Sequence, residues 1–276
     1  MLTVVEAEND QGALLTMALS DVSDGIILKE VDGLGPVKAT LVSSSFAGID
    51  GEQYHSARRE PRDIKLKFGM EPMYGGTSVR EIRKRLYKHF MTKRNVNLRF
   101  YMEDGLVVNI SGKVESNDPP MFTREPEMEV VVRCFKPDFV DPTPVTVSST
   151  STSATGVLTE LVEYDGTAET GIVLTVNVDR TLSEFTFYHQ GPDGVLSSMD
   201  FAASLLAGDV LTISTVSGNK YATLIRGGTS IPIVYGISPY SKWTELLEGD
   251  NYIRLYTDGV SGVPYSIEYT NRYGGL

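Results

Sequence analysis

Apolar and polar residues alternate in short runs in the first half of the chain, which is the pattern of half-buried strands. In DIKLKF (63–68), Ile64, Leu66 and Phe68 share one face, and the two lysines between them share the other. Further strands are predicted in VNLRFYM (96–102), LVVNISGKV (106–114) and EMEVVVRCF (127–135). Residues 103–105, Glu-Asp-Gly, have the composition of a turn, so residues 96–114 are predicted to form a hairpin.

The pattern changes to a helical period in SVREIRKRLYKHFM (78–91). The Ser78 hydroxyl can accept a hydrogen bond from a backbone N–H of the first turn, and Glu81 follows three residues later. Together these two residues predict a capping box. The apolar residues Val79, Ile82, Leu86 and Phe90 recur at helical spacing and predict one buried stripe.

The second half consists of short runs of strand-forming residues separated by Gly, Pro, Asn or Asp. About eight such runs at a spacing of roughly a dozen residues favour a β-sandwich or jelly roll. The runs are GVLTELVEY, GIVLTVNV, EFTFYH, GDVLTIST, KYATLI, IPIVYG, NYIRLYT and PYSIEYT.

Between the halves lies FKPDFVDPTPVTVSSTSTSATG (135–156), where three prolines precede a run of Ser and Thr. This composition is typical of an extended connector, and its Ser/Thr run has room for the first strand of the next domain. A length of 276 residues also suits two domains. We therefore predict a mainly β protein with a β-rich α+β domain carrying one helix over 1–140 and an all-β sandwich over 141–276.

Charge is distributed unevenly between these two regions, although the whole chain has a net charge of −11. Residues 1–140 hold 19 basic and 21 acidic side chains, whereas residues 141–276 hold 6 and 15. The second region should repel nucleic acid and anionic membranes. No run approaches 18 apolar residues and no signal peptide is visible, so we expect a soluble protein made in a reducing compartment.

Residues with catalytic or metal-binding chemistry are scattered. Cys134 is the only cysteine, which excludes an intrachain disulfide and a cysteine-based zinc site. His55, His89 and His189 lie far apart, without partners at metal-ligand spacing. Known nucleophile, phosphate-loop and dinucleotide motifs are absent, and no carboxylate pair is marked by an apolar setting. We therefore expect no enzymatic activity, no cofactor and no metal.

A basic cluster in residues 80–99 is the main candidate for an interaction surface. It holds eight basic residues against Glu81, and Arg80, Lys84 and Lys88 follow one another at helical spacing as a cationic ridge. Three interpretations remain open: a solvated face, a contact with another copy or a protein partner, and a nucleic-acid contact. The candidates for a subunit or hub interface are Arg80, Arg83, Lys84, Arg85 and Lys88.

Trp243 is the only tryptophan of the chain, and it lies in the polar stretch SKWTELLEGDNYIRLY (241–256). With Tyr240 it could form a platform for a sugar ring, and a hot spot for a protein partner is a second possibility. Leu246 and a turn at 248–251 follow it, however. This order favours a third interpretation, in which the indole closes one end of the sandwich core.

Several of these motifs, taken in order, resemble the siphophage distal tail protein (Dit) family. LLAGDVLTISTVSGNKYATLIRGG (205–228), the Ser-x-Trp-x-x-Leu and Gly-x-Asn segments within 241–256, and YSIEYTNRYGGL (265–276) are similar to the C-terminal part of that family. In the first half, ARREPRDIKLKF (57–68) resembles its Arg-x-Ile strand. VVVRCFKPDF (130–139) resembles its Cys-x-Pro ending but departs from it by reading Cys-Phe-Lys-Pro.

This resemblance implies a structural protein of the virion, located at the tail tip and assembled in the host cytoplasm. It implies that the first domain is tail-tube-like and forms a homohexameric ring, and that the second is a galectin-like sandwich on the periphery. The implied partners are other copies of the chain, the tail tube protein, hub and tape-measure-associated proteins, and a receptor-binding protein. It implies neither a membrane partner nor specific binding of nucleic acid.

Two alternative functions remain open from the sequence. The first is a carbohydrate-binding module that contacts saccharides of the host surface through Tyr240 and Trp243. The second is a nucleic-acid-binding protein that acts through residues 80–99, although the acidic composition argues against it.

Overall fold

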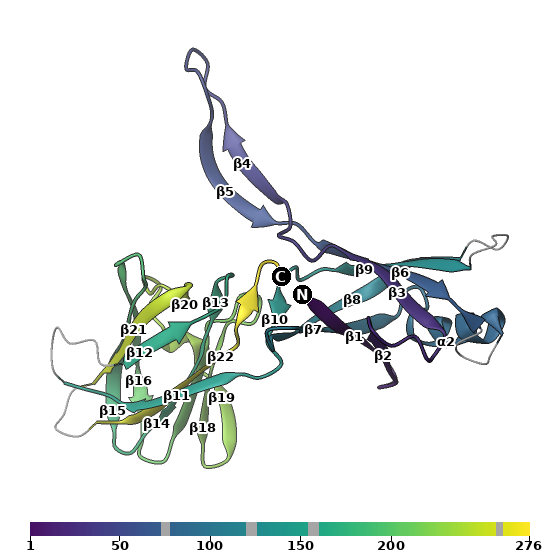
Figure 1. The fold of residues 1–276 in the computed structure, drawn as a ribbon. Helices are drawn as coiled ribbons and strands as arrows, with labels where there is room; N and C mark the ends of the chain where they lie inside the picture. Colours follow the sequence, from purple (N-terminus) through teal and green to yellow (C-terminus); the bar gives the residue numbers. More distant parts are fainter. Residues whose placement is uncertain (73–77, 120–125, 154–159, 258–261) are drawn as a thin grey trace. The chain divides into compact units, whose positions relative to one another are not determined.

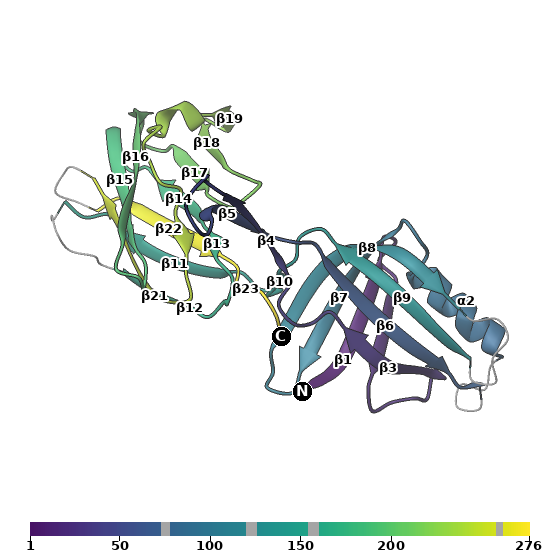
Figure 2. The ribbon, with the colours of Figure 1, turned by 90° about the horizontal axis from the view of Figure 1, so that it is seen from above.

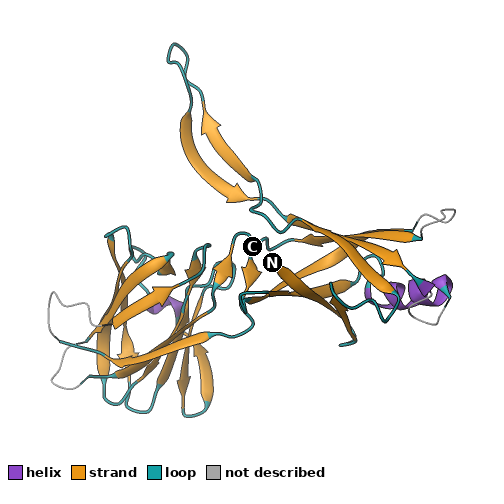
Figure 3. Ribbon diagram, viewed as in Figure 1, coloured by secondary structure: helices purple, strands orange, loops and turns teal. Residues whose placement is uncertain are grey.

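The computed structural model describes residues 1–72, 78–119, 126–153, 160–257 and 262–276. Strands dominate it, so the prediction of a mainly β protein is confirmed (Figure 3). The chain divides into two compact units, of which the first contains residues 1–142 together with 274–276, and the second contains residues 143–273. The expected junction at residue 140 lies two residues from this division.

The first unit is built on one antiparallel sheet with the strand order β2-β1-β7-β8-β9-β6-β3, and a short strand, β10, pairs with β8. The predicted strands at 63–68, 96–102, 106–114 and 127–135 are present as β6 to β9, and β7 and β8 form the predicted hairpin. The sequence did not predict the strands before residue 60. The bounds are β1 (Leu2–Asn9), β2 (Leu14–Ala18), β3 (Ile26–Asp32), β4 (Ala39–Ser44), β5 (Gln53–Arg59), β6 (Arg62–Met70), β7 (Asn95–Met102), β8 (Val107–Asp118), β9 (Glu127–Cys134) and β10 (Phe139–Val140).

The predicted helix is α2 (Val79–His89), which packs on one end of this sheet (Figure 2). Its capping box is confirmed, because the Ser78 side chain accepts from the Glu81 N–H and the Glu81 carboxylate accepts from the Ser78 N–H at 2.9 Å. Ile82 and Leu86 are buried, and the Phe90 ring beyond the helix lies 5.5 Å from the Phe68 ring of β6. The apolar stripe therefore covers the buried face of the sheet.

Arg62, the arginine of the Arg-x-Ile motif, is buried at the start of β6 and holds three separate segments together. Its Nε donates to the carbonyl of Pro137 at 2.7 Å. Nη1 donates to the carbonyls of Gly33 and Gly35 at 2.5 and 2.6 Å, and Nη2 to that of Gly274 at 2.5 Å. The arginine of the motif thus donates hydrogen bonds to several loop carbonyls at once. Only a guanidinium can do this, because it carries five N–H donors in one rigid plane.

The last three residues of the chain return to the first unit. The Leu276 N–H donates to the Leu34 carbonyl at 2.9 Å, next to the Arg62–Gly274 bond. Gly275 makes this approach possible, because a Cβ there would lie 2.8 Å from Pro36 Cδ and 3.1 Å from the Gly35 carbonyl carbon. The sequence had left open where the C-terminus packs.

The second unit is a sandwich of two antiparallel sheets, with orders β11-β22-β14-β17-β18-β19 and β12-β21-β15-β16, and a small pair β13-β20 (Figure 1). One apolar cluster lies between the sheets, as predicted for a β-sandwich. The bounds are β11 (Val145–Thr150), β12 (Glu160–Tyr164), β13 (Thr170–Gly171), β14 (Val173–Asn177), β15 (Leu182–Gln190), β16 (Leu196–Leu205), β17 (Val210–Ser214), β18 (Tyr221–Arg226), β19 (Thr229–Pro232), β20 (Glu245–Leu246), β21 (Gly249–Tyr256), β22 (Pro264–Tyr269) and β23 (Arg272–Tyr273).

One strand prediction in this unit needs correction, one long strand was not predicted, and one predicted strand falls partly outside the described residues. IPIVYG is a strand only to Pro232, and Val234–Gly236 form a 3₁₀ turn, η1. Gly236 seats this turn on the core, because a Cβ there would meet the Phe201 ring at 2.7 Å, and that ring stacks on Phe185 at 4.9 Å. Strand β16 was missed. Residues 154–159, which end the connector and begin GVLTELVEY, lie outside the described residues.

The prediction of a turn at 248–251 is wrong, because the Gly-x-Asn segment forms the first three residues of β21. The bend before this strand is held by the buried Asn251. Its Nδ2 donates to the carbonyls of Leu247 and Gly249, at 2.7 and 2.8 Å. Because Nδ2 faces two carbonyls, the amide oxygen must face His189, and it lies 3.0 Å from His189 Nε2. Nε2 therefore carries the proton of the imidazole.

Candidate assembly surfaces

Strands β4 and β5 pair only with each other among the described residues and form a hairpin, here called the hairpin arm (residues 39–59) (Figure 1). Its side chains are almost all exposed. Leu41 is 66% exposed, and Phe46 and Ile49 in the turn are 53% and 70% exposed. A two-stranded hairpin is at best marginally stable in water unless its apolar side chains find a surface to pack on.

The base of the hairpin arm is fixed to the first unit. Arg59 Nη1 pairs with Asp138 Oδ1 at 2.6 Å, and the Glu60 N–H donates to the Lys38 carbonyl at 2.9 Å. Toward the turn, the Leu41–Ala57 pair shares one face of the ribbon with Tyr54. The arm is therefore anchored at one end and presents uncovered apolar groups beyond it.

A second surface in the first unit is a groove of about 440 Å³, here called the apolar groove. It is lined by residues 109–113 of β8, by Asn95, and by Phe135, Lys136, Asp138 and Val140. Its wall is predominantly apolar, and Phe135 is 63% exposed at its edge. Exposed phenylalanine beside an apolar concavity is typical of a surface that another molecule covers.

Helix α2 presents a third surface, the cationic ridge, where Arg80, Lys84 and Lys88 are all exposed. The other two interface candidates differ from these three. Arg85 pairs with Asp24 at 2.8 Å, and Arg83 is partly buried. The helix thus divides the predicted set into three solvent-facing cations and two that are engaged within the unit.

The remaining cations of the basic cluster also belong mostly to local pairs. Arg94 lies 3.6 Å from Asp10, and Arg99 lies 3.6 Å from Glu6 on the neighbouring strand. Neutralised in this way, they add little to the field of the ridge. Fewer unpaired cations therefore remain in residues 80–99 than the sequence suggests, which argues against a nucleic-acid contact through the whole cluster.

The two residues of the predicted sugar platform differ in their surroundings. Tyr240 is 93% exposed, whereas Trp243 is partly buried and packs against the apolar cluster of the second unit. The ammonium group of Lys220 lies 5.4 Å from the centre of the Trp243 ring. This arrangement supports the interpretation of Trp243 as a cover for the end of the sandwich core.

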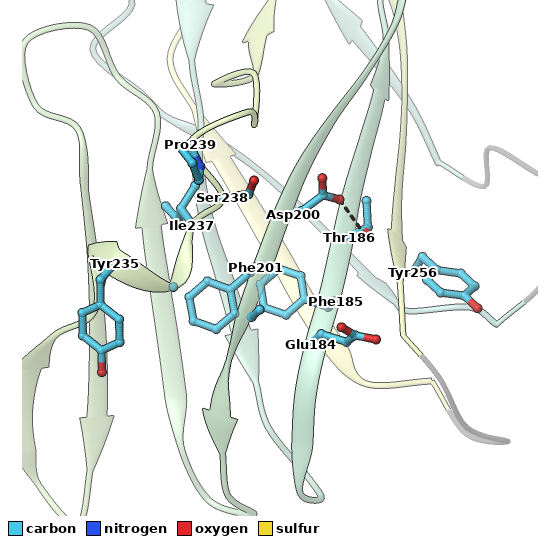
Figure 4. A pocket seen from close by; sticks show the side chains of 12 residues that line it. Glu184, Phe185, Thr186, Asp200, Phe201, Tyr235, Ile237, Ser238, Pro239 and Tyr256 are labelled. Atoms are coloured by element: carbon cyan, nitrogen blue, oxygen red, sulfur yellow. Dashed lines mark hydrogen bonds between the residues drawn. The ribbon is translucent and has the colours of Figure 1, made fainter.

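The second unit has a groove of about 450 Å³ across β15 and β16, here called the sandwich groove (Figure 4). Tyr235 and Tyr256 lie on either side of it. Glu184 and Asp200 contribute carboxylates, and Asp200 Oδ1 accepts from Thr186 Oγ1 at 2.9 Å. Aromatic rings beside hydrogen-bond acceptors are suited to polar ligands with apolar faces.

The structure offers little catalytic or metal-binding chemistry in the described ranges. No group of three His, Cys, Asp or Glu side chains there could hold a metal ion. Burial raises the pKa of the Cys134 thiol to about 12, so it stays protonated at neutral pH and is a poor nucleophile. No helix of the described segments is long and apolar enough to cross a membrane.

These observations describe a mainly β protein with an anchored arm and an open groove in its first unit, and a sandwich with its own groove as its second unit. Residues 165–273 match the family described as "Siphovirus-type tail component, C-terminal domain". No curated protein sequence matches the chain. The crystal structure of the Dit protein of phage SPP1 has a TM-score of 0.66 and 16% identity, covering 98% of this chain and 99% of that one. A chain of the phage P2 baseplate has a TM-score of 0.49 and 10% identity, with full coverage of both chains.

The resemblance to the distal tail protein family that the motifs indicated is therefore supported over residues 165–273 by the match to the siphovirus-type tail component domain. The family match covers most of the second unit. The SPP1 structure shows that the fold of both units is shared.

Proposed function

We propose that this chain forms a closed ring, with six copies, at the distal end of the tail tube and joins the tube to the hub of the tail tip. The first unit forms the ring, and the second is a galectin-like peripheral domain near which receptor-binding components attach. The Dit protein of phage SPP1 is described as a paradigm of a hub adsorption apparatus, and the shared fold makes the same role the natural proposal here.

The observation that carries the ring is the presence of two different unsatisfied surfaces in one unit. The hairpin arm exposes apolar side chains, and the apolar groove lies in the same unit. A contact between two different patches is heterologous, and it produces a ring when its rotation closes. The acidic second region, with 15 acidic against 6 basic residues over 141–276, suits the solvent-facing periphery of a large assembly.

The test is to measure the mass of the purified full chain by light scattering and to image it by negative stain, alone and mixed with the tail tube protein. Six-fold rings are expected in at least one of these preparations. A chain that remains monomeric in both would contradict the ring.

The sandwich groove supports a second candidate function, which is contact with saccharides of the host surface. Exposed Tyr235 offers a stacking face, and Glu184 and Asp200 offer acceptors for hydroxyl groups. The sandwich groove replaces Tyr240 and Trp243 as the candidate saccharide site, because Trp243 packs on the core. Titration with cell-wall and surface saccharides, repeated with Tyr235→Ala, would test it. Binding that Tyr235→Ala leaves unchanged would exclude this groove.

A further inference from the structure

We propose that the turn of the hairpin arm of one copy docks in the apolar groove of a neighbouring copy. This inference rests on the ring proposed above and names the two surfaces that make its repeated contact.

The turn of the hairpin arm combines apolar side chains with negative charge. Residues 45–52 read SFAGIDGE and contain Phe46, Ile49, Asp50 and Glu52, with no basic residue. Phe46 and Ile49 are exposed, and a bond from the Ile49 N–H to the Phe46 carbonyl at 3.3 Å holds them in one turn. The docking element is therefore an apolar knob that carries two carboxylates.

The apolar groove has the complementary character. Ile110, Phe135 and Val140 contribute apolar wall, and Lys113 and Lys136 lie along it. The described residues provide no ion-pair partner for either lysine, whereas Asp138 is neutralised by Arg59 at 2.6 Å. The uncompensated charge of the groove is positive, so it attracts the acidic turn and fixes its orientation.

The arm cannot fill the groove of its own chain. Asp138 lines the groove and also anchors Arg59 at the base of the arm, so the groove lies beside the base. Strand β5, Gln53–Arg59, has 7 residues. At a rise of about 3.3 Å per residue, it places the turn roughly 20 Å from that base. A second copy is the occupant that satisfies both surfaces, and each copy then gives an arm to one neighbour and a groove to the other.

A pair of engineered cysteines tests the contact directly. The variant Ile49→Cys with Ser111→Cys, in the full chain, is expected to give a ladder of disulfide-linked oligomers under mild oxidation. Cys134 does not compete, because its thiol is buried and protonated. The matched control pairs Ile49→Cys with Ser217→Cys, which lies in an exposed turn of the second unit, and should give no ladder.

A charge swap tests the electrostatic half of the proposal. Asp50→Lys with Glu52→Lys should weaken self-association at least tenfold, and so should Lys113→Glu with Lys136→Glu. Mixing these two variants should restore association to within about threefold of wild type, while thermal melting shows that each remains folded. Sedimentation velocity over a concentration series measures the association.

The outcomes separate this inference from the proposed function. Six-fold rings without the cross-linked ladder, or with full association of both charge variants, would overturn the arm-to-groove contact and leave the ring intact. A ladder with closed assemblies of another symmetry would support the contact and contradict the hexamer. Absence of both rings and ladder, with and without the tail tube protein, would overturn both.

Discussion

The guanidinium carbon of Arg62 lies 4.4 Å from the centre of the Phe139 ring. Arg62 opens β6 and Phe139 opens β10, so this contact joins two strands that are distant in the sequence. The Phe139 ring covers one face of the guanidinium, and the N–H groups of the guanidinium donate hydrogen bonds to loop carbonyls. Together these contacts explain how a charged residue can be buried there. Arg62 thus joins β6 to β10 through Phe139 and to the loop segments through its hydrogen bonds.

Replacement of Arg62 should strongly destabilise the first unit. In Arg62→Ala the carbonyls of Gly33, Gly35 and Gly274 lose their donor, and we expect a loss of about 3 to 5 kcal/mol in the free energy of unfolding. Urea denaturation followed by circular dichroism measures it. Arg58→Ala is the control, because Arg58 is exposed, and it should change the stability by less than about 0.5 kcal/mol. Equal effects of the two variants would contradict this role.

Asp209 should make the second unit sensitive to acid. Arg226 donates to this buried carboxylate through Nε at 3.0 Å and Nη2 at 2.6 Å, and these hydrogen bonds lower the pKa of Asp209 below 3.8. The stabilisation is therefore complete above pH 3.8 and is lost as the pH falls through the lower pKa of the folded state. Asp209→Asn should cost about 2 kcal/mol at pH 7 and should flatten the acid limb of the stability curve. An unchanged acid limb would exclude Asp209 as its source.

His189 should produce a second pH dependence, at higher pH. Burial lowers the pKa of its imidazole below 6.5, although the bond to Asn251 opposes the shift. The unfolded chain then binds a proton more readily, so stability is expected to fall as the pH drops below 6.5. His189→Gln should remove this slope in denaturation curves between pH 5 and 7. His55→Gln, at an exposed site, should leave the slope as in wild type.

Replacement of Trp243 should lower the stability of the second unit, whereas replacement of Tyr240 should not. Trp243→Ala uncovers part of the sandwich core, and we expect a loss of about 2 kcal/mol because the indole is only partly buried. Tyr240→Ala should leave stability within about 0.5 kcal/mol. Denaturation of the two variants side by side measures both values. Comparable stability of the two variants would contradict the role of Trp243 as a cover for the core.

The cationic ridge should affect assembly without affecting folding. Arg80→Glu combined with Lys84→Glu should leave the melting temperature nearly unchanged, because both side chains are exposed on α2. If the ridge contacts an acidic surface of another copy or of the hub, ring formation or hub binding should weaken, most clearly at low salt. Arg85→Glu breaks the pair with Asp24 and serves as a comparison. If the double variant assembles like wild type, the cationic ridge is a solvated face and not a contact surface.

The resemblance of separate motifs to one family is supported by the match over residues 165–273, but it did not explain the motifs. The reason for the Arg-x-Ile arginine became visible only when Gly33, Pro137 and Gly274 were found around Arg62. The asparagine of the Gly-x-Asn segment likewise gained its explanation from the buried His189. The hairpin arm was missed, and the only signal for it was a weak alternation on either side of Phe46, Gly48 and Gly51.

Local periodicity by itself determined the strands around Ile64 and Leu98, and the helix capped by Ser78 and Glu81. These features depend on residues within a few positions of one another, so their pattern is visible in a single sequence. The tertiary structure alone decided which charges are free and which surfaces meet water. Arg85 is paired because Asp24, 61 residues away, lies beside it, whereas Lys84 is exposed. Such pairings depend on how the chain crosses its sheets, and that arrangement is set by packing over long sequence separations.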